Sequence, residues 1–457
     1  MSYSPILPID SGRYGTAEVK KIFSDESRLR YMLMVEAAVS KVEGLLKIIP
    51  EEASKEICSK CSIENVSYSM WKDIEKVTKH ETASLVEAIV SVVSEKAKPW
   101  VHYGLTSNDV LDTAQSLQLK DYFKIVERKL GYLISVLGSL AEKYASLPSV
   151  GRTHGQHASI ISFGQKFAVW ANDLLDHLNR LNEIKPRVLV CKTLGVVGSG
   201  SVLGPEALKV MQLVGEELGL YPVKAATQVV SRENYAEFVW WCALVGSTLD
   251  KIATEFRNLS RTEIDEFEEE FSKDQIGSSA VPSKRNPISC EKVSSLSKLL
   301  RAMPVVALEN IALWHERDLT NSANERFIIP ISAIILDEMI ETVCNVLSKM
   351  NIRENVVRAN IERTKGLIYS EFVLDVLLKK GFSRSEAHKI LRELSTRCRV
   401  EGKEFKEILL ADDLVSKFIS REEIDKIFVP ENHIEGSKEI IKRTLERIRK
   451  EVGSTYS

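Results

Sequence analysis

The chain has 457 residues, of which 44% are hydrophobic and 28% are charged. This is the composition of a globular protein with enough residues for two or three domains. The formal net charge is −2, so the sequence offers no overall basic surface for nucleic acid or an anionic membrane. An anionic ligand would therefore need locally clustered arginines and lysines.

The lack of a recognisable targeting signal and the cysteine content lead us to expect a cytoplasmic protein. The first residues lack the basic and apolar regions of a signal peptide, and no run of about 18 apolar residues occurs. Seven scattered cysteines indicate reduced thiols. Cys58 and Cys61 form a C-x-x-C, but neither further zinc ligands nor a βαβ context accompanies them. We interpret this pair as incidental thiols.

Long helices are the dominant pattern of the middle of the chain. From Asp112 to Leu147, apolar residues recur at steps of three and four, which lines one helix face. At ~1.5 Å per residue this gives a rod on the order of 50 Å. Similar stripes predict a second rod from Ile160 to Leu181 and a third from Phe238 to Leu259.

Two more helices complete the predicted bundle. One is expected from about Glu291 to Trp314 with a kink at Pro304, and the other after Pro330. Helices this long bury their faces only against comparably long neighbours, which predicts a bundle. The chain is thus expected to be all-α, with a helical N-terminal domain, a central long-helix bundle and a helical C-terminal domain. Their expected bounds are residues 1–111, 112–360 and 361–457.

Four polar stretches interrupt this pattern, and the first lies directly before the first rod. It reads W-V-H-Y-G-L-T-S-N-D from Trp100 to Asp109. Serine, asparagine and aspartate at this position are typical helix N-caps. A helix start is also an anion site, because its backbone N–H groups are free. Both interpretations hold together, and Thr106 and Ser107 would then face a carboxylate.

The second stretch contains two histidines three residues apart. It reads G-R-T-H-G-Q-H-A from Gly151 to Ala158. No carboxylate or cysteine lies nearby to complete a metal site. A histidine outside such a cluster is more often structural, although an imidazole with a pKa of ~6.5 also suits a general acid. The residues alone leave both roles open for His154.

The third and fourth stretches are rich in cations. Residues 277–288 read G-S-S-A-V-P-S-K-R-N-P-I, which is either a solvated connector with capping serines or a binding loop. Residues 314–326 read W-H-E-R-D-L-T-N-S-A-N-E-R. This is either a charged helix end or a phosphate clamp formed by Arg317, Ser322 and Arg326. In a clamp, the forked donors of the two arginines would bind the phosphate oxygens.

These motifs resemble those of a known superfamily. Residues 277–288 are similar to the signature loop of the fumarase/aspartase superfamily, with Val281 where Met is usual and Ser283 where His is common. The first two stretches resemble its other motifs, with Asn108 as a variation. The fourth resembles the adenylosuccinate lyases in particular. Argininosuccinate lyases and fumarases, whose substrates carry no phosphate, lack it.

Shorter matches extend the resemblance over nearly the whole chain. Arg13-Tyr14 resembles the nucleotide contact R-Y of the adenylosuccinate lyases, and Lys79-His80-Glu81 aligns with their R-H-D. Gln228 fits a further substrate contact. The segment Gly366–Glu371 resembles the start of their C-terminal domain.

The resemblance implies a homotetramer without metal or cofactor, in which each active site draws on three chains. The implied reaction eliminates fumarate from adenylosuccinate to give AMP. It also converts the succinylcarboxamide imidazole nucleotide (SAICAR) to AICAR in purine biosynthesis. No nucleic acid or membrane partner is expected.

The resemblance also assigns roles to residues. Ser278 is the implied base, although from chemistry alone a histidine would be the better choice. His154 is the implied acid with His80 nearby, Lys284 stabilises developing charge, and Glu291 orients a neighbour such as His80. The implied substrate contacts are Arg13, Tyr14, Lys79, His80, Glu81, His102, Thr106, Ser107, Gln228, Lys284, Asn286, Arg317, Ser322 and Arg326.

Two other functions compete with this interpretation. A carboxymuconate cycloisomerase shares much of the 277–288 loop but should lack the arginine clamp. A non-catalytic helical scaffold, which some members of the superfamily became in the lens, would have no reason to keep Ser278, His154 and Lys284 together.

The sequence predicts catalysis without a metal, because no grouping has the ligand number and spacing for one. Exhaustive treatment with a chelator should leave the release of fumarate unchanged. A loss of rate that an added divalent ion restores would contradict this prediction.

Overall fold

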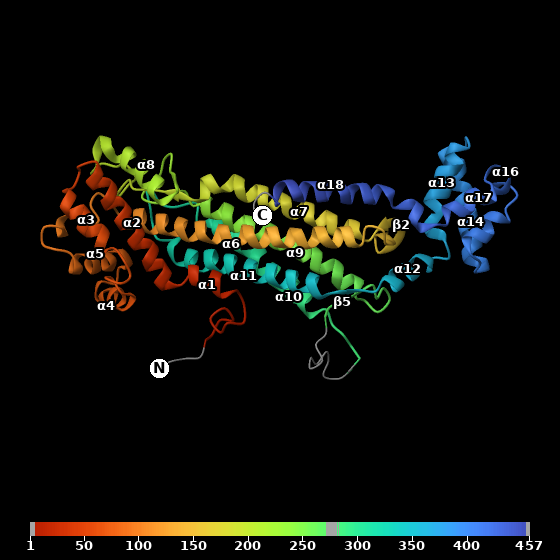
Figure 1. Cartoon of the computed structure of the whole chain (residues 1–457), viewed down its shortest axis with the longest axis horizontal. Coiled ribbons are helices and arrows are strands. Elements are labelled where there is room, and N and C mark those ends of the chain that lie inside the picture. The colour runs from red at the N-terminus through yellow and green to blue at the C-terminus, as the bar shows by residue number, and fades with distance from the viewer. Residues whose placement is uncertain (1–4, 271–280, 282, 454–457) are drawn as a thin grey trace. The chain divides into compact units, whose positions relative to one another are not determined.

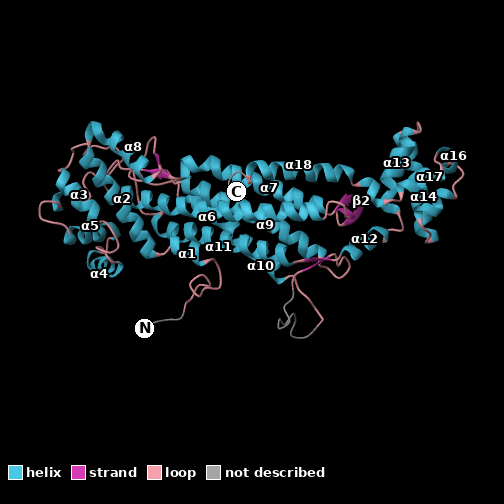
Figure 2. Cartoon of the chain, in the orientation of Figure 1, coloured by secondary structure: helices cyan, strands magenta, loops and turns pink. Residues whose placement is uncertain are grey.

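The computed structural model describes residues 5–270, 281 and 283–453, and these are mostly helical (Figure 2). The expected all-α class is confirmed. By packing, the chain divides into two compact units. Unit 1 comprises Met1–Leu130, His177–Leu249 and Ser295–Glu341, and unit 2 comprises Gly131–Asp176, Asp250–Ser294 and Thr342–Ser457. The division into 1–111, 112–360 and 361–457 stays a prediction.

Five long helices have residues in both units. They are α6 (Ser107–Lys143), α7 (Gly164–Val188), α9 (Glu233–Leu259), α10 (Ile288–Glu309) and α11 (Ser322–Lys349) (Figure 1). The stripe predicted for α6 is buried, for example at Leu119, Phe123 and Leu137. Pro304 lies inside α10, as expected. Pro330 lies inside α11 rather than before it, so the predicted start of the fifth helix was wrong.

Unit 1 adds short helices to its parts of the long ones. These are α1 (Ala17–Ile22), α2 (Asp25–Leu45), α3 (Glu51–Lys60), α4 (Tyr68–Thr78), α5 (Glu81–Val92) and α8 (Ala207–Leu218). Helix α2 packs against α3 and α8. The parallel strands β3 (Val190–Cys191) and β4 (Tyr221–Pro222) form a two-stranded sheet. In the core of unit 1, the rings of Tyr122 and Phe123 pack against the ring of Phe238, with centroids 5.9 and 5.8 Å away. The Trp241 ring packs against Phe123, with the centroids 6.4 Å apart.

Unit 2 contains a β-hairpin that the sequence interpretation missed. Strand β1 (Pro148–Thr153) pairs antiparallel with β2 (Gln156–Ser162), and α7 begins only at Gly164. Ile160 therefore lies in a strand, and the predicted start of the second rod was wrong. Val150 and Ile160 are buried in the core that the C-terminal helices build, so those helices hold the hairpin in place.

The remaining elements of unit 2 follow α11. They are α12 (Glu354–Glu362), α13 (Ser370–Lys379), α14 (Arg384–Glu401), α15 (Phe405–Leu410), α16 (Val415–Phe418), α17 (Arg421–Ile427) and α18 (Glu435–Glu451), with 3₁₀ turns at Leu367–Tyr369 and Pro430–His433. Strands β5 (Phe267–Glu268) and β6 (Asn351–Ile352) pair antiparallel. Over the described ranges, no helix is both long and apolar enough to cross a bilayer.

Candidate active site

The start of α6 is built around a buried aspartate. The Asp109 carboxylate accepts hydrogen bonds from the backbone N–H of Thr106 (2.8 Å), Leu194 (3.1 Å) and Gly195 (3.0 Å). It also pairs with the Lys192 ammonium, and both side chains are fully buried. Ser107 begins the helix. The helix start for which the sequence predicts an anion site is thus fixed by an ion pair that the sequence interpretation did not anticipate, and the anion site itself stays a prediction.

The junction between α4 and α5 carries the Lys79-His80-Glu81 motif. Lys79 ends α4 in the left-handed conformation, at φ 55°. His80 caps α5, because its Nδ1 accepts the N–H of Ala83 at 3.1 Å. Nδ1 is therefore unprotonated in the neutral ring, and Nε2 carries the proton. The exposed His80 can donate this proton to a ligand.

Glu81 joins two arginines rather than standing alone. Its carboxylate accepts a hydrogen bond from Arg28 Nε at 2.6 Å and one from Arg326 Nη2 at 2.9 Å, with its side chain only 10% exposed. A carboxylate held between two guanidiniums fixes the orientation of both. The sequence predicted a substrate contact for Glu81 and assigned no role to Arg28.

The three residues predicted to clamp a phosphate line one cavity. Arg317, Ser322 and Arg326 surround a polar space of about 50 Å³ together with Arg28. Arg317 Nη1 donates to Gln228 Oε1 at 2.7 Å, and Gln228 Nε2 donates to Val196 O at 2.9 Å. The structure thus brings the predicted contact Gln228 into direct contact with the clamp.

The walls of this cavity contain polar atoms without partners. Buried side-chain atoms that make no hydrogen bond are Asn108 Oδ1, Gln115 Nε2, Arg317 Nε, Asn321 Oδ1 and Glu325 Oε1. Unpaired buried polar atoms are costly, which indicates a cavity built for a polar guest. Beneath it, the buried Arg232 pairs with Asp112 (2.6 Å) and Glu325 (3.0 Å). Burial and the nearby Arg232 charge lower the pKa of Arg317.

Two predicted contacts make few side-chain interactions in the structure. The guanidinium of Arg13 lies 5.9 Å from the centroid of the Tyr14 ring. Arg13 is exposed and Tyr14 is partly exposed. Neither lines the cavity around Arg317.

His154 lies at the tip of the hairpin in unit 2. It and Gly155 form the two-residue turn, with φ of 54° and 75°, so both backbones are left-handed. The His154 side chain is exposed. Arg152 ties the hairpin to Glu266, which has no exposed side-chain surface, through Nη2···Oε1 (2.6 Å) and Nη1···Oε2 (3.3 Å). The base of the hairpin is therefore fixed by this ion pair, and the exposed imidazole of His154 can contact a ligand.

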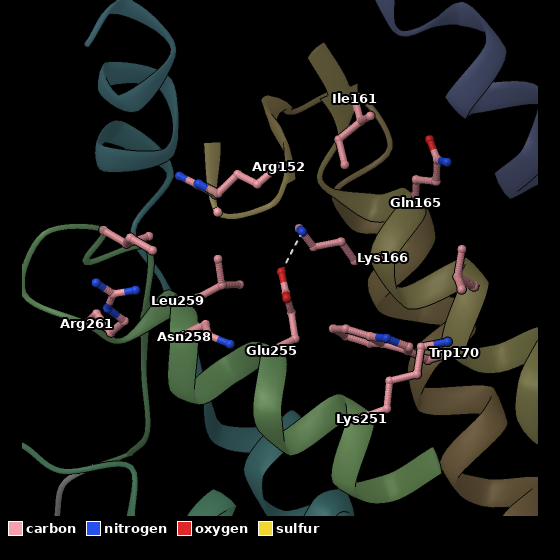
Figure 3. A pocket seen from close by; sticks show the side chains of 13 residues that line it. Arg152, Ile161, Gln165, Lys166, Trp170, Lys251, Glu255, Asn258, Leu259 and Arg261 are labelled. Atoms are coloured by element: carbon pink, nitrogen blue, oxygen red, sulfur yellow. Dashed lines mark hydrogen bonds and ion pairs between the residues drawn. The ribbon is translucent and has the colours of Figure 1, made fainter. Parts of the chain in front are cut away.

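A cavity of about 550 Å³ lies beside this hairpin. Figure 3 shows Lys166 of α7 and Glu255 of α9 facing each other across it, paired at 2.6 Å. Arg152, Lys251 and Arg261 also line it, together with apolar side chains such as Trp170 and Leu259. The second histidine, His157, has a buried Nδ1 without a partner, and burial and Arg152 lower its pKa.

The described part of the signature loop faces a second cavity of unit 2. Lys284, Asn286 and Glu291 line a space of about 840 Å³. The backbone N–H groups of Ser289 (3.1 Å) and Cys290 (2.8 Å) donate to the Glu269 carboxylate, which caps α10. The predicted base, Ser278, lies outside the described residues.

Some residues of these sites had no visible signal in the sequence. Arg28 and Arg232 sit in ordinary polar positions, and their role follows only from the carboxylates that packing brings to them. The glycine-rich run after Lys192 was a usable signal for a special loop, because glycine permits left-handed backbone. For the hairpin, the glycine of His154-Gly155 was a usable signal of a turn, because glycine permits the left-handed backbone of a two-residue turn.

The long-helix fold and its site-bearing loops define a class of lyases. The sequence matches the lyase family over residues 12–301, more than half of the chain, and the adenylosuccinate lyase C-terminus over residues 366–444. A solved structure of the 3-carboxy-cis,cis-muconate lactonizing enzyme from Pseudomonas putida superposes with a TM-score of 0.87. It has 27% identity and covers 97% of this chain and 100% of that one.

Relatives narrow the class to one family. Adenylosuccinate lyase from Pyrococcus horikoshii is 41% identical, over 97% of this chain and 98% of the relative. The enzyme of the same name from Methanocaldococcus jannaschii is 39% identical, over 97% of this chain and 96% of the relative. The chain therefore belongs to the adenylosuccinate lyase family of the fumarase/aspartase superfamily, and it is a lyase.

The cavity around Arg317 generates a prediction about affinity. Replacing Arg317 or Arg326 with alanine should raise KM for a phosphate-bearing substrate about tenfold to a hundredfold, because a charge-assisted hydrogen bond contributes about 1.5–3 kcal/mol. Arg187→Ala, which removes an exposed ion pair with Glu237, is the matched control and should change KM little. Wild-type affinity for AMP in both clamp variants would show that these arginines form only a solvated helix end.

Proposed function

We propose that the chain cleaves adenylosuccinate to AMP and fumarate, and SAICAR to AICAR and fumarate. The observation that carries this proposal is the polar cavity lined by Arg317, Ser322 and Arg326, in which two buried donors without partners, Arg317 Nε and Gln115 Nε2, suit a phosphate group. The names of the relatives support the same substrate. A muconate cycloisomerase, whose substrate has no phosphate, would have no use for this clamp.

The proposed reaction needs a base, groups that stabilise the developing negative charge, and an acid for the leaving nitrogen. The base takes a proton from the β-carbon of the succinyl group, and the electron pair left behind delocalises onto the adjacent carboxylate. Lys284 supplies fixed positive charge and Asn286 a hydrogen-bond donor to that dianion. The bond to the purine nitrogen then breaks. His154 donates a proton to the leaving nitrogen, and fumarate departs.

The remaining residues bind and orient the substrate. Thr106 and Ser107, at the start of α6, suit a succinyl carboxylate because the helix N-terminus favours negative charge. His80 carries its neutral-form proton on Nε2 and can donate it near the leaving group. The assignment of Ser278 as base rests on the family motif, since a serine hydroxyl is a weak base until it is activated.

Purified protein tests this proposal directly. Incubated with adenylosuccinate, it should release fumarate and AMP in equal amounts. Fumarate is followed by its ultraviolet absorbance and AMP by chromatography. Turnover of 3-carboxymuconate without any cleavage of adenylosuccinate would instead assign the chain to the cycloisomerases.

The family's shared active site is proposed for this chain as well. We infer a homotetramer in which the Thr106, His154 and Ser278 stretches of one site come from three chains. Support comes from large apolar side chains left exposed on helices, such as Trp240 (54%) of α9 and Leu308 (58%) of α10, which line an open apolar cleft. The exposed position of His154 fits a site that a second chain completes. The free thiols of all seven cysteines fit a reducing cytoplasm.

Subunit mixing tests the shared site. His154→Ala and Ser278→Ala should each be inactive. Dissociated and reassembled together in equal amounts, they should regain activity in about a quarter of the sites, by random assortment of two chain types in a symmetric oligomer. Each variant reassembled with itself is the control. Hybrid tetramers, verified by mass spectrometry, that stay inactive would show that each site is built within one chain.

A further inference from the structure

His102 has an unusual backbone and a specific partner. It is a non-glycine residue with φ of 61°, a left-handed conformation that is uncommon for a side chain of its size. Its Nδ1 lies 2.6 Å from Oε1 of Glu36 in α2, 66 residues earlier in the chain. Within the described ranges, its other nitrogen, Nε2, makes no hydrogen bond. The ring is thus held by one nitrogen while the other can meet a ligand.

Glu36 lies in the buried face of α2. Its side chain is 2% exposed, and the hydrogen bond to His102 is the one its carboxylate makes with the described residues. A buried carboxylate without a cation is strongly disfavoured. The pair is therefore stable as carboxylate and imidazolium, in which Nδ1–H donates to Oε1.

We propose that Glu36 is a positioning residue for the reaction: its buried carboxylate fixes the ring of His102 and keeps it cationic, so that Nε2–H is presented to the anionic substrate. This inference rests on the proposed function, in which His102 is a substrate contact. It adds a residue of α2 that none of the site motifs contains. It also explains why a histidine is maintained in a left-handed conformation directly before the anion-binding start of α6.

The surrounding charges agree with this role. Burial lowers the pKa of His102, but the charge and hydrogen bond of Glu36 outweigh burial and raise it above its usual range. Asp109 raises it further, although the Lys192 ammonium neutralises much of that carboxylate. His102 therefore loses its proton at a higher pH than a free imidazole does.

Two other titratable groups are close to Glu36. Burial, with a smaller effect of the Glu36 charge, raises the pKa of Glu43 to about 8, so Glu43 is protonated at pH 7. Burial and Glu36 also raise the pKa of Cys61 in the segment after α3, which keeps this thiol neutral. Glu43 thus provides a control of matched burial on the same helix.

The experiment compares Glu36→Gln with Glu43→Gln. Gln keeps the shape and hydrogen-bonding capacity of Glu36 but removes its charge, so burial should then lower the pKa of His102. KM for adenylosuccinate should rise about tenfold at pH 7, because a charge-assisted contact becomes a neutral one. The rise of KM with pH should begin at lower pH than in the wild type, with kcat less affected. Glu43→Gln replaces a group that is already neutral and should keep the wild-type KM at pH 7.

A second readout is independent of turnover. Carbethoxylation by diethyl pyrocarbonate modifies the neutral imidazole, so its pH dependence, followed at His102 by peptide mass spectrometry, reports the pKa of this residue. That profile should move to lower pH in Glu36→Gln and stay in place in Glu43→Gln. In a His102→Gln background, adding Glu36→Gln should change KM no further, because the effects of two residues acting through one contact are not additive.

The outcomes separate the possibilities. A wild-type protein that modifies as expected but releases no fumarate from adenylosuccinate would remove the proposed function while leaving the Glu36–His102 pairing intact. Glu36→Gln with lower thermal stability but unchanged KM and unchanged pH profiles would make Glu36 purely structural. Additive effects of Glu36→Gln and His102→Gln on KM would mean that Glu36 acts by another route, and either result overturns the inference.

Discussion

The buried carboxylate of Asp109 is the interaction on which the loops around the start of α6 depend. It neutralises Lys192 and ties the N–H of Thr106 to those of Leu194 and Gly195, so one side chain joins the start of α6 to a glycine-rich loop. That loop in turn accepts from Gln228, which holds Arg317. Removing one member of a fully buried ion pair leaves the other uncompensated, at a cost of about 3–5 kcal/mol. The position of the start of α6 is therefore set by a buried charge whose contacts all lie within the protein.

Other cations of the chain are also held by buried carboxylates. Four of them are each held by a carboxylate with little or no exposure: His102 by Glu36, Arg152 by Glu266, Arg232 by Asp112 and Arg326 by Glu81. A polyanionic substrate needs positive charge that is already oriented, because reorganising donors during the reaction would cost part of the stabilisation. Free arginines and lysines would satisfy the charge but not the orientation. Pairing each cation with a carboxylate lowers the net charge and makes the geometry permanent, which suits a chain with a formal net charge of −2.

Prediction from the sequence succeeded where a feature repeats along the chain. The long helices were predictable because residues such as Leu119, Phe123 and Val126 repeat with helical spacing over many turns, and burial follows that spacing. The hairpin was missed because two short strands and a His-Gly turn give few residues of pattern beside such strong helical stripes. The motifs located Arg317, Ser322 and Arg326, which line one cavity. Their supports could not be found in this way, because Glu36 reads as an ordinary helical glutamate and Lys192 as one lysine among many. Only the packing of distant segments gives them partners.

Left-handed backbone recurs at residues of the sequence motifs. The described non-glycine residues with positive φ are Lys47, Lys79, His102, His154, Asp265, His315 and Lys365, and four of these (Lys79, His102, His154 and His315) belong to the motifs. Each left-handed residue costs about 1–3 kcal/mol, so it persists only where the surroundings fix it. Lys79 closes α4 directly before His80, and His154 occupies a turn whose strands are anchored in the C-terminal core. In both cases the backbone, rather than a flexible side chain, determines where an imidazole lies. A long side chain could reach the same point, but it would have to be ordered each time substrate binds. Strain stored during folding replaces that cost, which accounts for the positions of His80 at a helix cap and His154 in a tight turn.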